Sequence, residues 1–291
     1  MIIHLVDGTY ELFRCYYGNK RSGRLHDRRG AVRLVLHALI SMAKDGGTHF
    51  GVATDHVIQS FRNALWPGYK TGEGVEPELL AQFHPLEEAL SAFGFVVWPM
   101  VDLEADDALA SAARLAEAAE GVEKVCIWSP DKDLAQCVKG ARVVQVDRRG
   151  GHIRDEAAVR EKFGVPPASI PDYLALVGDS ADGYPGIPGW GAKSAAAALS
   201  RYAHLSDMPI DDPEWRPPAA NAAGLAESLR SNWDKALLFL RLATLRVDAD
   251  LFSSVDALRW KGPGPDAARV AGSVGDETLV EKAERAFAGS A

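Results

Sequence analysis

The chain has 291 residues, of which 47% are hydrophobic and 25% charged, and these proportions are typical of a folded globular protein rather than a disordered one. Its 40 acidic and 32 basic side chains give a formal net charge of −8, which taken as a sum disfavours binding to a polyanion. Three cysteines without a Cys-x-x-Cys pair exclude a disulfide framework or a zinc site, and no signal-like or membrane-spanning stretch is present, so we expect a cytoplasmic protein that does not bind a membrane.

Short apolar runs alternate with amphipathic segments over roughly the first half of the chain. The apolar runs predict buried strands at 2–6, 49–54, 94–98, 124–129 and 142–146. Apolar positions at helical spacing predict helices over 31–43, 78–93 and 106–119. The alternation favours an α/β domain, in which helices flank a mostly parallel sheet.

The pattern changes near residue 165, after which few runs resemble strands. Helices are predicted at 170–177, 191–202, 222–230 and 233–246, separated by turns rich in glycine and proline. The segment 203–221 is predicted to be a surface loop, and the tail from 262 is also rich in turn-forming residues. We therefore expect an α/β domain over 1–168 and a helical domain over 169–291.

Acidic residues follow the predicted strands, at the sheet edge where open parallel sheets bind ligands. Two strands end in an aspartate, the motifs LEADD and SPDKD follow two others, and GDSADG adds acids from the helical region. The nine candidate metal ligands are Asp7, Asp55, Glu104, Asp106, Asp107, Asp131, Asp133, Asp179 and Asp182.

Any one of these acids is typical of a turn or a helix N-cap, and Asp107 in particular suits a helix N-terminus. Together in one crevice, however, they would repel one another strongly without cations. Carboxylates without histidine or cysteine favour a hard divalent ion, Mg²⁺ or Mn²⁺. Two such ions suit the hydrolysis of a phosphodiester bond.

Two segments have features of phosphate-binding surfaces. Residues 14–33 hold basic side chains interleaved with tyrosine and glycine, although such a run is often a solvated loop. The segment GYPGIPGWGAKSAAAA at 183–198 joins a glycine-rich turn to a helix N-terminus, as in modules that hold a DNA backbone; a plain turn between helices is the alternative. The basic residues of the first segment are Arg14, Lys20, Arg21, Arg24, Arg28, Arg29 and Arg33, against the single acid Asp27.

Through the motifs LVDG, SFRNALWPGYK, LEADDALA, SPDKDL and GDSADGYPGIPGWGAKSA, residues 3–202 resemble the bacterial 5′ nuclease, or flap endonuclease, family. This family includes the 5′–3′ exonuclease domain of bacterial DNA polymerase I. The resemblance implies a PIN-like nuclease domain, a helix–three-turn–helix motif at about 172–202, and metal-dependent hydrolysis of DNA with a 5′ end or 5′ flap in replication and repair. The length leaves no room for a polymerase domain, so we expect a stand-alone, monomeric nuclease beside a separate DNA polymerase.

The resemblance also assigns roles by position. The acids from Asp7 to Asp106 match ligands of a first ion, and those from Asp131 to Asp182 a second group. Lys70 matches the residue placed against the scissile phosphate, and we expect it to act in catalysis with Asp7, Asp106 and Asp131. The family also holds K⁺ on carbonyls of the helix–three-turn–helix. Arg62 is expected to contact phosphate, and Tyr69 to stack on a base. The other expected DNA contacts are Arg14, Arg21, Arg28, Arg29, Lys70, Gly189, Gly191 and Lys193.

Two features depart from the family pattern. No lysine or arginine lies between Lys70 and Arg114, where the family forms an arch over a single strand, and an acidic arch should grip that strand poorly. Gly183 stands where many members have asparagine. A catalytically weak or inactive DNA-structure-binding paralogue therefore remains an alternative, as does a PIN-domain ribonuclease, which would leave the helix–three-turn–helix unexplained.

Overall fold

The computed structural model describes residues 1–21, 27–148 and 150–290 and divides into two compact units. Unit 1 comprises residues 1–58, 72–129 and 246–291, and unit 2 comprises residues 59–71 and 130–245. The boundary expected at 168/169 falls inside unit 2. The last 46 residues belong to the same unit as the N-terminus because their apolar side chains pack in its core.

Unit 1 is built on four parallel strands. Strand β1 (Ile2–Asp7) lies between β2 (His49–Asp55) and β4 (Lys124–Trp128), and β2 also pairs with β3 (Val96–Met100). All four strands lie within two residues of the predicted runs, and their apolar side chains are largely buried. The predicted α/β class with a mostly parallel sheet is thus confirmed.

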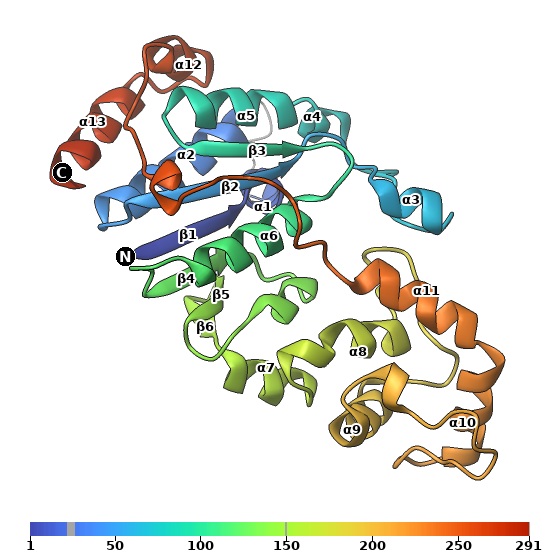
Figure 1. Ribbon diagram of the computed structural model, residues 1–291. Helices are drawn as coiled ribbons and strands as arrows, with labels where there is room; N and C mark the ends of the chain where they lie inside the picture. Colours follow the sequence, from blue (N-terminus) through green and yellow to red (C-terminus); the bar gives the residue numbers. More distant parts are fainter. Residues whose placement is uncertain (22–26, 149, 291) are drawn as a thin grey trace. The chain divides into compact units, whose positions relative to one another are not determined.

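Helices cover both faces of these strands (Figure 1). On one face lie α1 (Gly8–Arg21), α2 (Gly30–Lys44) and α5 (Phe83–Ala92), and on the other lies α6 (Ala105–Ala118). The helix predicted at 78–93 is in fact two, because a separate short helix α4 (Pro77–Leu80) precedes α5. Pro85, which has no amide donor, is tolerated in the first turn of α5 but not within one continuous helix.

The C-terminal tail is helical, contrary to the expectation of turns from residue 262. After a short 3₁₀ turn η4 (Val255–Leu258), α12 (Ala267–Ser273) and α13 (Thr278–Ser290) pack in the core of unit 1. Trp260 anchors this segment: its ring stacks on Phe95 with centroids 5.3 Å apart, and its indole Nε1 donates to the carbonyl of Phe93 at 2.8 Å.

Unit 2 is mostly helical. It contains α3 (Phe61–Leu65), the antiparallel pair β5 (Val143–Asp147) and β6 (His152–Arg154), and a series of helices around one apolar core. These helices are α7 (Glu156–Phe163), α8 (Ile170–Val177), α9 (Ala192–Tyr202), α10 (Ala222–Ser231) and α11 (Trp233–Ala243). The four predicted helices match α8 to α11, and α8 packs against both α9 and α11.

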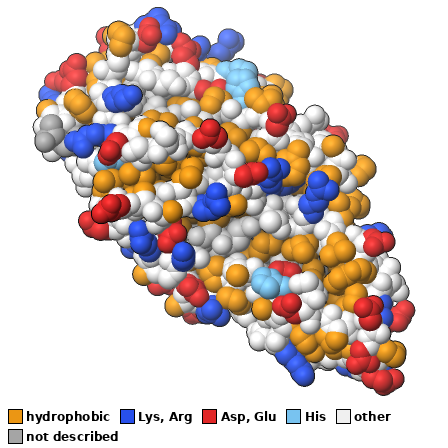
Figure 2. All heavy atoms as spheres, in the orientation of Figure 1, with side chains coloured by type: hydrophobic (Ala, Val, Ile, Leu, Met, Phe, Trp, Pro, Cys, Tyr) orange, Lys and Arg blue, Asp and Glu red, His pale blue; other side chains and the backbone are white. Residues whose placement is uncertain are grey.

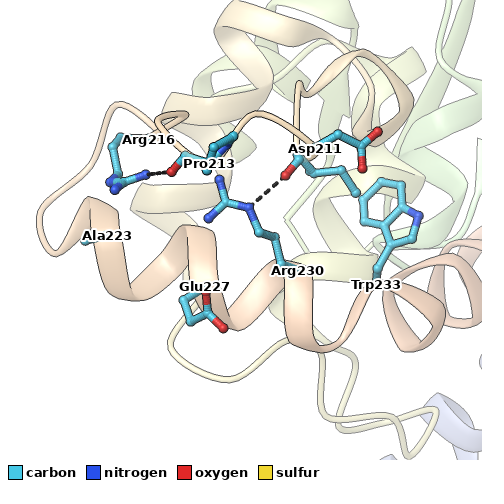
Figure 3. A pocket seen from close by; sticks show the side chains of 8 residues that line it. Asp211, Pro213, Arg216, Ala223, Glu227, Arg230 and Trp233 are labelled. Atoms are coloured by element: carbon cyan, nitrogen blue, oxygen red, sulfur yellow. Dashed lines mark hydrogen bonds between the residues drawn. The ribbon is translucent and has the colours of Figure 1, made fainter.

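The segment 203–221 contains only a short 3₁₀ turn, η3 (Leu205–Asp207), as expected of a surface loop. Arg230 on α10 holds it in place by donating to the carbonyls of Ile210 at 2.7 Å and Asp212 at 2.6 Å. Figure 3 shows this guanidinium pointing at the loop, in an open pocket that Arg216 and Trp233 also line. Because both arginines bond to backbone carbonyls there, we assign them to holding the loop.

Within the described residues, no helix is both long enough and apolar enough to span a bilayer. On the face drawn in Figure 2, basic and acidic side chains are interspersed. The excess of acids in the composition is therefore not gathered into one acidic surface on that face.

Replacement of Trp260 by alanine should lower the free energy of unfolding by about 3–5 kcal/mol, the usual cost of removing a buried aromatic side chain. Urea denaturation followed by circular dichroism measures this change. Lys261→Ala, at the adjacent exposed position, is the control and should alter stability by less than about 0.5 kcal/mol. Equal stability of the two variants would contradict the anchoring role of Trp260.

Candidate functional site

The first group of acids lies at the carboxyl ends of the strands of unit 1. Asp7, the last residue of β1, accepts hydrogen bonds from the amide of Tyr10 at 2.8 Å and from the hydroxyl of Ser129, just beyond β4, at 2.9 Å. Asp55, the last residue of β2, accepts one from the amide of Ala105 at 2.8 Å. These bonds hold the two carboxylates against the first turns of α1 and α6, as the parallel strand order predicts.

Three further acids stand at the N-terminus of α6. Glu104 is the N-cap and is buried, and Asp106 is half-buried in the first turn. Asp107 is fully buried, and its two oxygens accept the backbone amides of Glu104 at 3.0 Å and Arg246 at 2.8 Å. Such bonding is that of a capping residue, so the geometry of Asp107 favours the N-terminal interpretation over metal ligation.

A second group, in unit 2, forms a compact carboxylate cluster, which we define as Asp133, Asp179 and Asp182. All three are buried, and one oxygen of each lies within 4.8 Å of the others. Asp133 begins the 3₁₀ helix η1 (Asp133–Cys137), whereas Asp179 and Asp182 lie in the turn after α8. Asp131 is exposed, and its carboxylate accepts the amide of Asp133 at 3.0 Å, which orients the start of η1.

Two lysines offset part of the negative charge of the carboxylate cluster. The ammonium of Lys132 lies 2.8 Å from Asp179, and that of Lys70 lies 2.9 Å from Asp182. Burial alone would lower the pKa of Lys132, but the hydrogen bond and charge of Asp179 raise it above its ordinary value. Lys132 is therefore held in its charged form.

Asp133 differs from the other two members of the cluster. Its Oδ1 is buried and has no hydrogen-bond partner among the described residues. Burial, followed by the charges of Asp131, Asp182 and Asp179, raises the pKa of Asp133 well above its ordinary value. A buried carboxyl in this state requires either a proton or a cation. An all-oxygen set with one unsatisfied oxygen fits a hard divalent ion.

The turn that carries Asp179 and Asp182 packs tightly against the segment before Lys70. The amide of Lys70 donates to the carbonyl of Asp182 at 3.0 Å, and the Trp66 indole donates to that of Gly183 at 3.0 Å. Gly183 has φ +84°, and a Cβ there would lie 2.0 Å from the carbonyl oxygen of Gly68. This contact explains the glycine, because neither asparagine nor any other side chain fits.

The same segment buries two residues that the sequence suggested as DNA contacts. Arg62 is 1% exposed and donates to the carbonyls of Leu242 at 2.8 Å and Thr244 at 3.3 Å. Tyr69 is 3% exposed and belongs to the core of unit 2. Their burial argues against a phosphate contact for Arg62 and base stacking for Tyr69. Both instead support the segment that presents Lys70.

The basic run is a helix over its first part rather than a loop, because residues 14–21 belong to α1. Arg14 pairs with the buried Glu11, and Arg21 donates to a carbonyl within its own helix. Arg29 bonds the hydroxyl of Ser273, whereas Arg28 is exposed; Arg24 lies outside the described residues. Lys20 pairs at 2.6 Å with Glu76 of the predicted acidic arch, so one charge of the basic run offsets one charge of the arch.

The expected helix–three-turn–helix corresponds to α8, the turn beyond it and α9. Gly191 is the N-cap of α9, and the hydroxyl of Ser194 bonds both its amide and its carbonyl at 3.0 Å. Gly189 has φ +83°, and Lys193 is exposed in the first turn. Together with Asn221 and its neighbours, these residues line an open hollow of about 580 Å³. The turn thus presents a helix N-terminus and an ammonium on an accessible surface.

Two polar residues of the site were not identified from the sequence: Ser129, which bonds Asp7, and Lys132, which pairs with Asp179. Both lie in the motif SPDKDL, beside or between its acids. For Ser129 the available signal was its place in this acidic motif. For Lys132 it was its place between two aspartates, because a lone cation among carboxylates indicates an ion pair.

Comparison with known families accounts for most of the chain. Residues 2–164 match the family described as "5'-3' exonuclease, N-terminal resolvase-like domain". Residues 165–266 match "5'-3' exonuclease, C-terminal SAM fold". The change from one family to the next, at 164/165, lies close to the change from strands to helices seen in the sequence.

Two curated relatives illustrate the similarity. DNA polymerase I of Pseudomonas aeruginosa is 34% identical over 268 residues, which cover 87% of this chain and 28% of that protein. A 5′–3′ exonuclease of Buchnera aphidicola is 27% identical over 254 residues, which cover 84% of this chain and 86% of that protein. The chain thus spans less than a third of the DNA polymerase I relative.

A solved structure of the bacteriophage T5 flap endonuclease, in a pseudo-enzyme-product complex with DNA and metal ions, has the same fold. Its TM-score is 0.66 at 18% identity, and the match covers 100% of this chain and 99% of that one. This likeness agrees with the α/β unit and helical region described above.

Asp133→Asn should change how the stability of the ion-free protein depends on pH. The unfolded chain loses the Asp133 proton near the ordinary pKa of 3.8, whereas the folded protein keeps it to higher pH. The folded state thus binds more protons in this interval, and its stability falls as pH rises. Melting temperatures in chelator, from pH 4 to 8, should fall more for the wild type than for Asp133→Asn. A constant difference across that range would contradict the assignment.

Arg62→Ala should lower the free energy of unfolding by roughly 2–3 kcal/mol, because two backbone carbonyls lose a charged donor. Chemical denaturation measures the loss. Arg160→Ala, which removes an exposed arginine paired with Glu156 at i,i+4, serves as the matched control and should cost well under 1 kcal/mol. A variant as stable as the wild type would restore Arg62 to the predicted DNA-contacting set.

Proposed function

The chain belongs to the 5′–3′ exonuclease family, and we propose that it is a divalent-metal-dependent, structure-specific 5′ nuclease. Its proposed substrate is DNA with a 5′ end or 5′ flap, whose phosphodiester bonds it hydrolyses. The observation that carries this proposal is the buried carboxylate cluster, in which Oδ1 of Asp133 has no hydrogen-bond partner among the described residues. The T5 structure, which holds DNA and metal ions, supports the choice of substrate and cofactor.

The proposed cofactor is Mg²⁺ or Mn²⁺, because the candidate ligands are all carboxylates. The carboxylate cluster, with Asp131 beside it, would hold one group of ions, and the acids Asp7, Asp55, Glu104 and Asp106 would hold another. Asp107 is not included, because it is fully buried as the N3 residue of the capping box of α6, and we assign it to capping. When bound, such ions act as Lewis acids and lower the pKa of water, which is the chemistry that phosphodiester hydrolysis needs.

Lys70 is the proposed phosphate-contacting residue. Its amide bonds the carbonyl of Asp182, and its own carbonyl accepts the side-chain amide of Asn63 at 3.0 Å. The backbone at this position is therefore held on both sides, and the partly exposed ammonium remains beside Asp182. Such fixed placement of a cation favours orientation of a scissile phosphate.

We propose two separate DNA-binding elements, the turn at 189–193 in unit 2 and, in unit 1, the basic residues of α1 together with Arg28 and Arg29. Gly189 and Gly191 allow the backbone to approach a phosphate closely, and Lys193 adds charge there. Carbonyls of the same turn are the proposed K⁺ ligands. Arg14, Arg21, Arg28 and Arg29 are the proposed phosphate contacts of the basic segment.

The DNA polymerase I relative suggests the wider setting. We propose that the chain acts in the cytoplasm as a monomer, on DNA intermediates of replication and repair, in company with polymerase activity. Within it, residues 1–168 would carry the nuclease acids of the strand edge, and residues 169–291 the helix–three-turn–helix.

Cleavage of a 5′-flap duplex in a Mg²⁺ and Mn²⁺ series, with product lengths mapped, tests the proposal. We expect cleavage by the wild type, and a loss of more than about 100-fold in the double variant Asp131→Ala, Asp133→Ala, because ligand removal abolishes ion binding. Flap affinity without ions should be largely retained. The double variant Asp211→Ala, Glu227→Ala removes the same charge from exposed positions of unit 2 and should cleave normally.

The outcomes separate the alternatives. Absence of cleavage with either ion would contradict nuclease activity, and tight flap binding without turnover would identify a DNA-structure-binding paralogue. Preferential cleavage of a matched RNA substrate would instead identify a ribonuclease. Full activity of the Asp131, Asp133 variant would show that the site is assigned wrongly.

A further inference from the structure

The buried hydroxyl of Tyr184 lacks a hydrogen-bond partner among the described residues. The side chain is 1% exposed, and its ring stacks on Phe239 with centroids 5.5 Å apart and 28° between planes. A buried tyrosine hydroxyl almost always has a partner, since losing water without replacement costs free energy. The packing of the ring therefore accounts for the aromatic part of the side chain but not for the burial of its hydroxyl.

The backbone directs Tyr184 toward the carboxylate cluster. Tyr184 and Asp179 form an antiparallel bridge, in which the amide of Asp179 donates to Tyr184 at 2.8 Å and the reverse bond is 3.0 Å. Side chains of directly paired residues project to the same side of such a ladder. The phenol ring thus extends from the same side as the carboxylate of Asp179, which belongs to the cluster.

The electrostatic surroundings agree with this direction. Burial raises the pKa of Tyr184 far above its ordinary value, and the charges of Asp133, Asp179 and Asp182 raise it further, against a smaller opposing effect of Arg62. The three carboxylates of the cluster thus act electrostatically on this hydroxyl. It is available as a donor among carboxylates, which only accept.

A second unsatisfied atom complements the first. Oδ1 of Asp133 is a buried acceptor without a partner among the described residues, and the hydroxyl of Tyr184 is a buried donor that likewise lacks one. A single buried water commonly satisfies two such groups at once, provided that the site is polar. The surrounding acids make this region polar.

We propose that Tyr184 is a positioning residue of the carboxylate cluster, whose hydroxyl donates through one buried water to Asp133 and fixes that carboxylate for a divalent ion. This inference rests on the proposed function, because it requires the cluster to bind an ion. Hydrogen bonds that orient metal ligands typically change metal affinity 10–100-fold when they are removed. A tyrosine in the turn GDSADGYPG would thus tune the affinity of this chain for its ion.

Tyr184→Phe tests the proposal, because it removes one oxygen and leaves the stacked ring. The measurement is Mn²⁺ binding to the chelator-stripped protein, followed by electron paramagnetic resonance of unbound Mn²⁺. We expect about tenfold weaker binding at one site, and a melting temperature in chelator close to that of the wild type. Tyr202→Phe is the matched control: its hydroxyl accepts from Trp215 at 3.0 Å, and its Mn²⁺ affinity should equal that of the wild type.

A double-mutant cycle shows whether Tyr184 acts through Asp133. In an Asp133→Asn background, adding Tyr184→Phe should cause no further loss of Mn²⁺ binding. Wild-type affinity in Tyr184→Phe, an equal loss in Tyr202→Phe, or an undiminished effect in the Asp133→Asn background would each overturn the inference while leaving the proposed nuclease intact. A wild type that cleaves no flap and binds no Mn²⁺ would overturn both.

Discussion

Mutual repulsion among buried carboxylates is the constraint on which the candidate site depends. Asp133, Asp179 and Asp182 lie within reach of one another away from water, where uncompensated charge is costly. Lys132 and Lys70 offset two of the three charges, and Asp133 responds with a raised pKa. Without an ion, the negative charge of the cluster is only partly offset, and this remaining charge makes the cluster suitable for binding an ion.

Two sets of contacts in unit 2 hold that cluster and Lys70 in place. The glycine turn after α8 brings two of the acids together, and only a residue without a side chain allows Gly68 to approach Gly183. Arg62 ties the segment 59–71 to the end of α11, so the backbone of Lys70 is held beside Asp182. The buried Arg62, which donates to backbone carbonyls, thus supports the segment that presents the accessible Lys70. In unit 1, backbone amides and Ser129 perform the equivalent task for Asp7 and Asp55.

Patterns of apolar residues predicted most of the secondary structure. A strand buried on both faces has a continuous apolar run, and a helix buried on one face has apolar residues at helical spacing. The exceptions have local causes. The polar and basic residues of α1 obscure its helical pattern, and glycines at 262, 264, 272 and 275 make the tail that holds α12 and α13 resemble a series of turns. The first two candidate acids were equally accessible to prediction, since they end parallel strands whose register brings their ends to one edge.

The sequence by itself therefore determined the alternating α/β order, the positions of the acids at strand ends, and the motifs of a 5′–3′ exonuclease. Only the tertiary structure decided which polar side chains face one another. It buried Arg62 and Tyr69, bound both oxygens of Asp107 to backbone amides, and paired Lys132 with Asp179. The reason is physical: a motif records residue types along the chain, whereas burial and hydrogen bonding depend on segments far apart in sequence, such as Arg62 and Leu242.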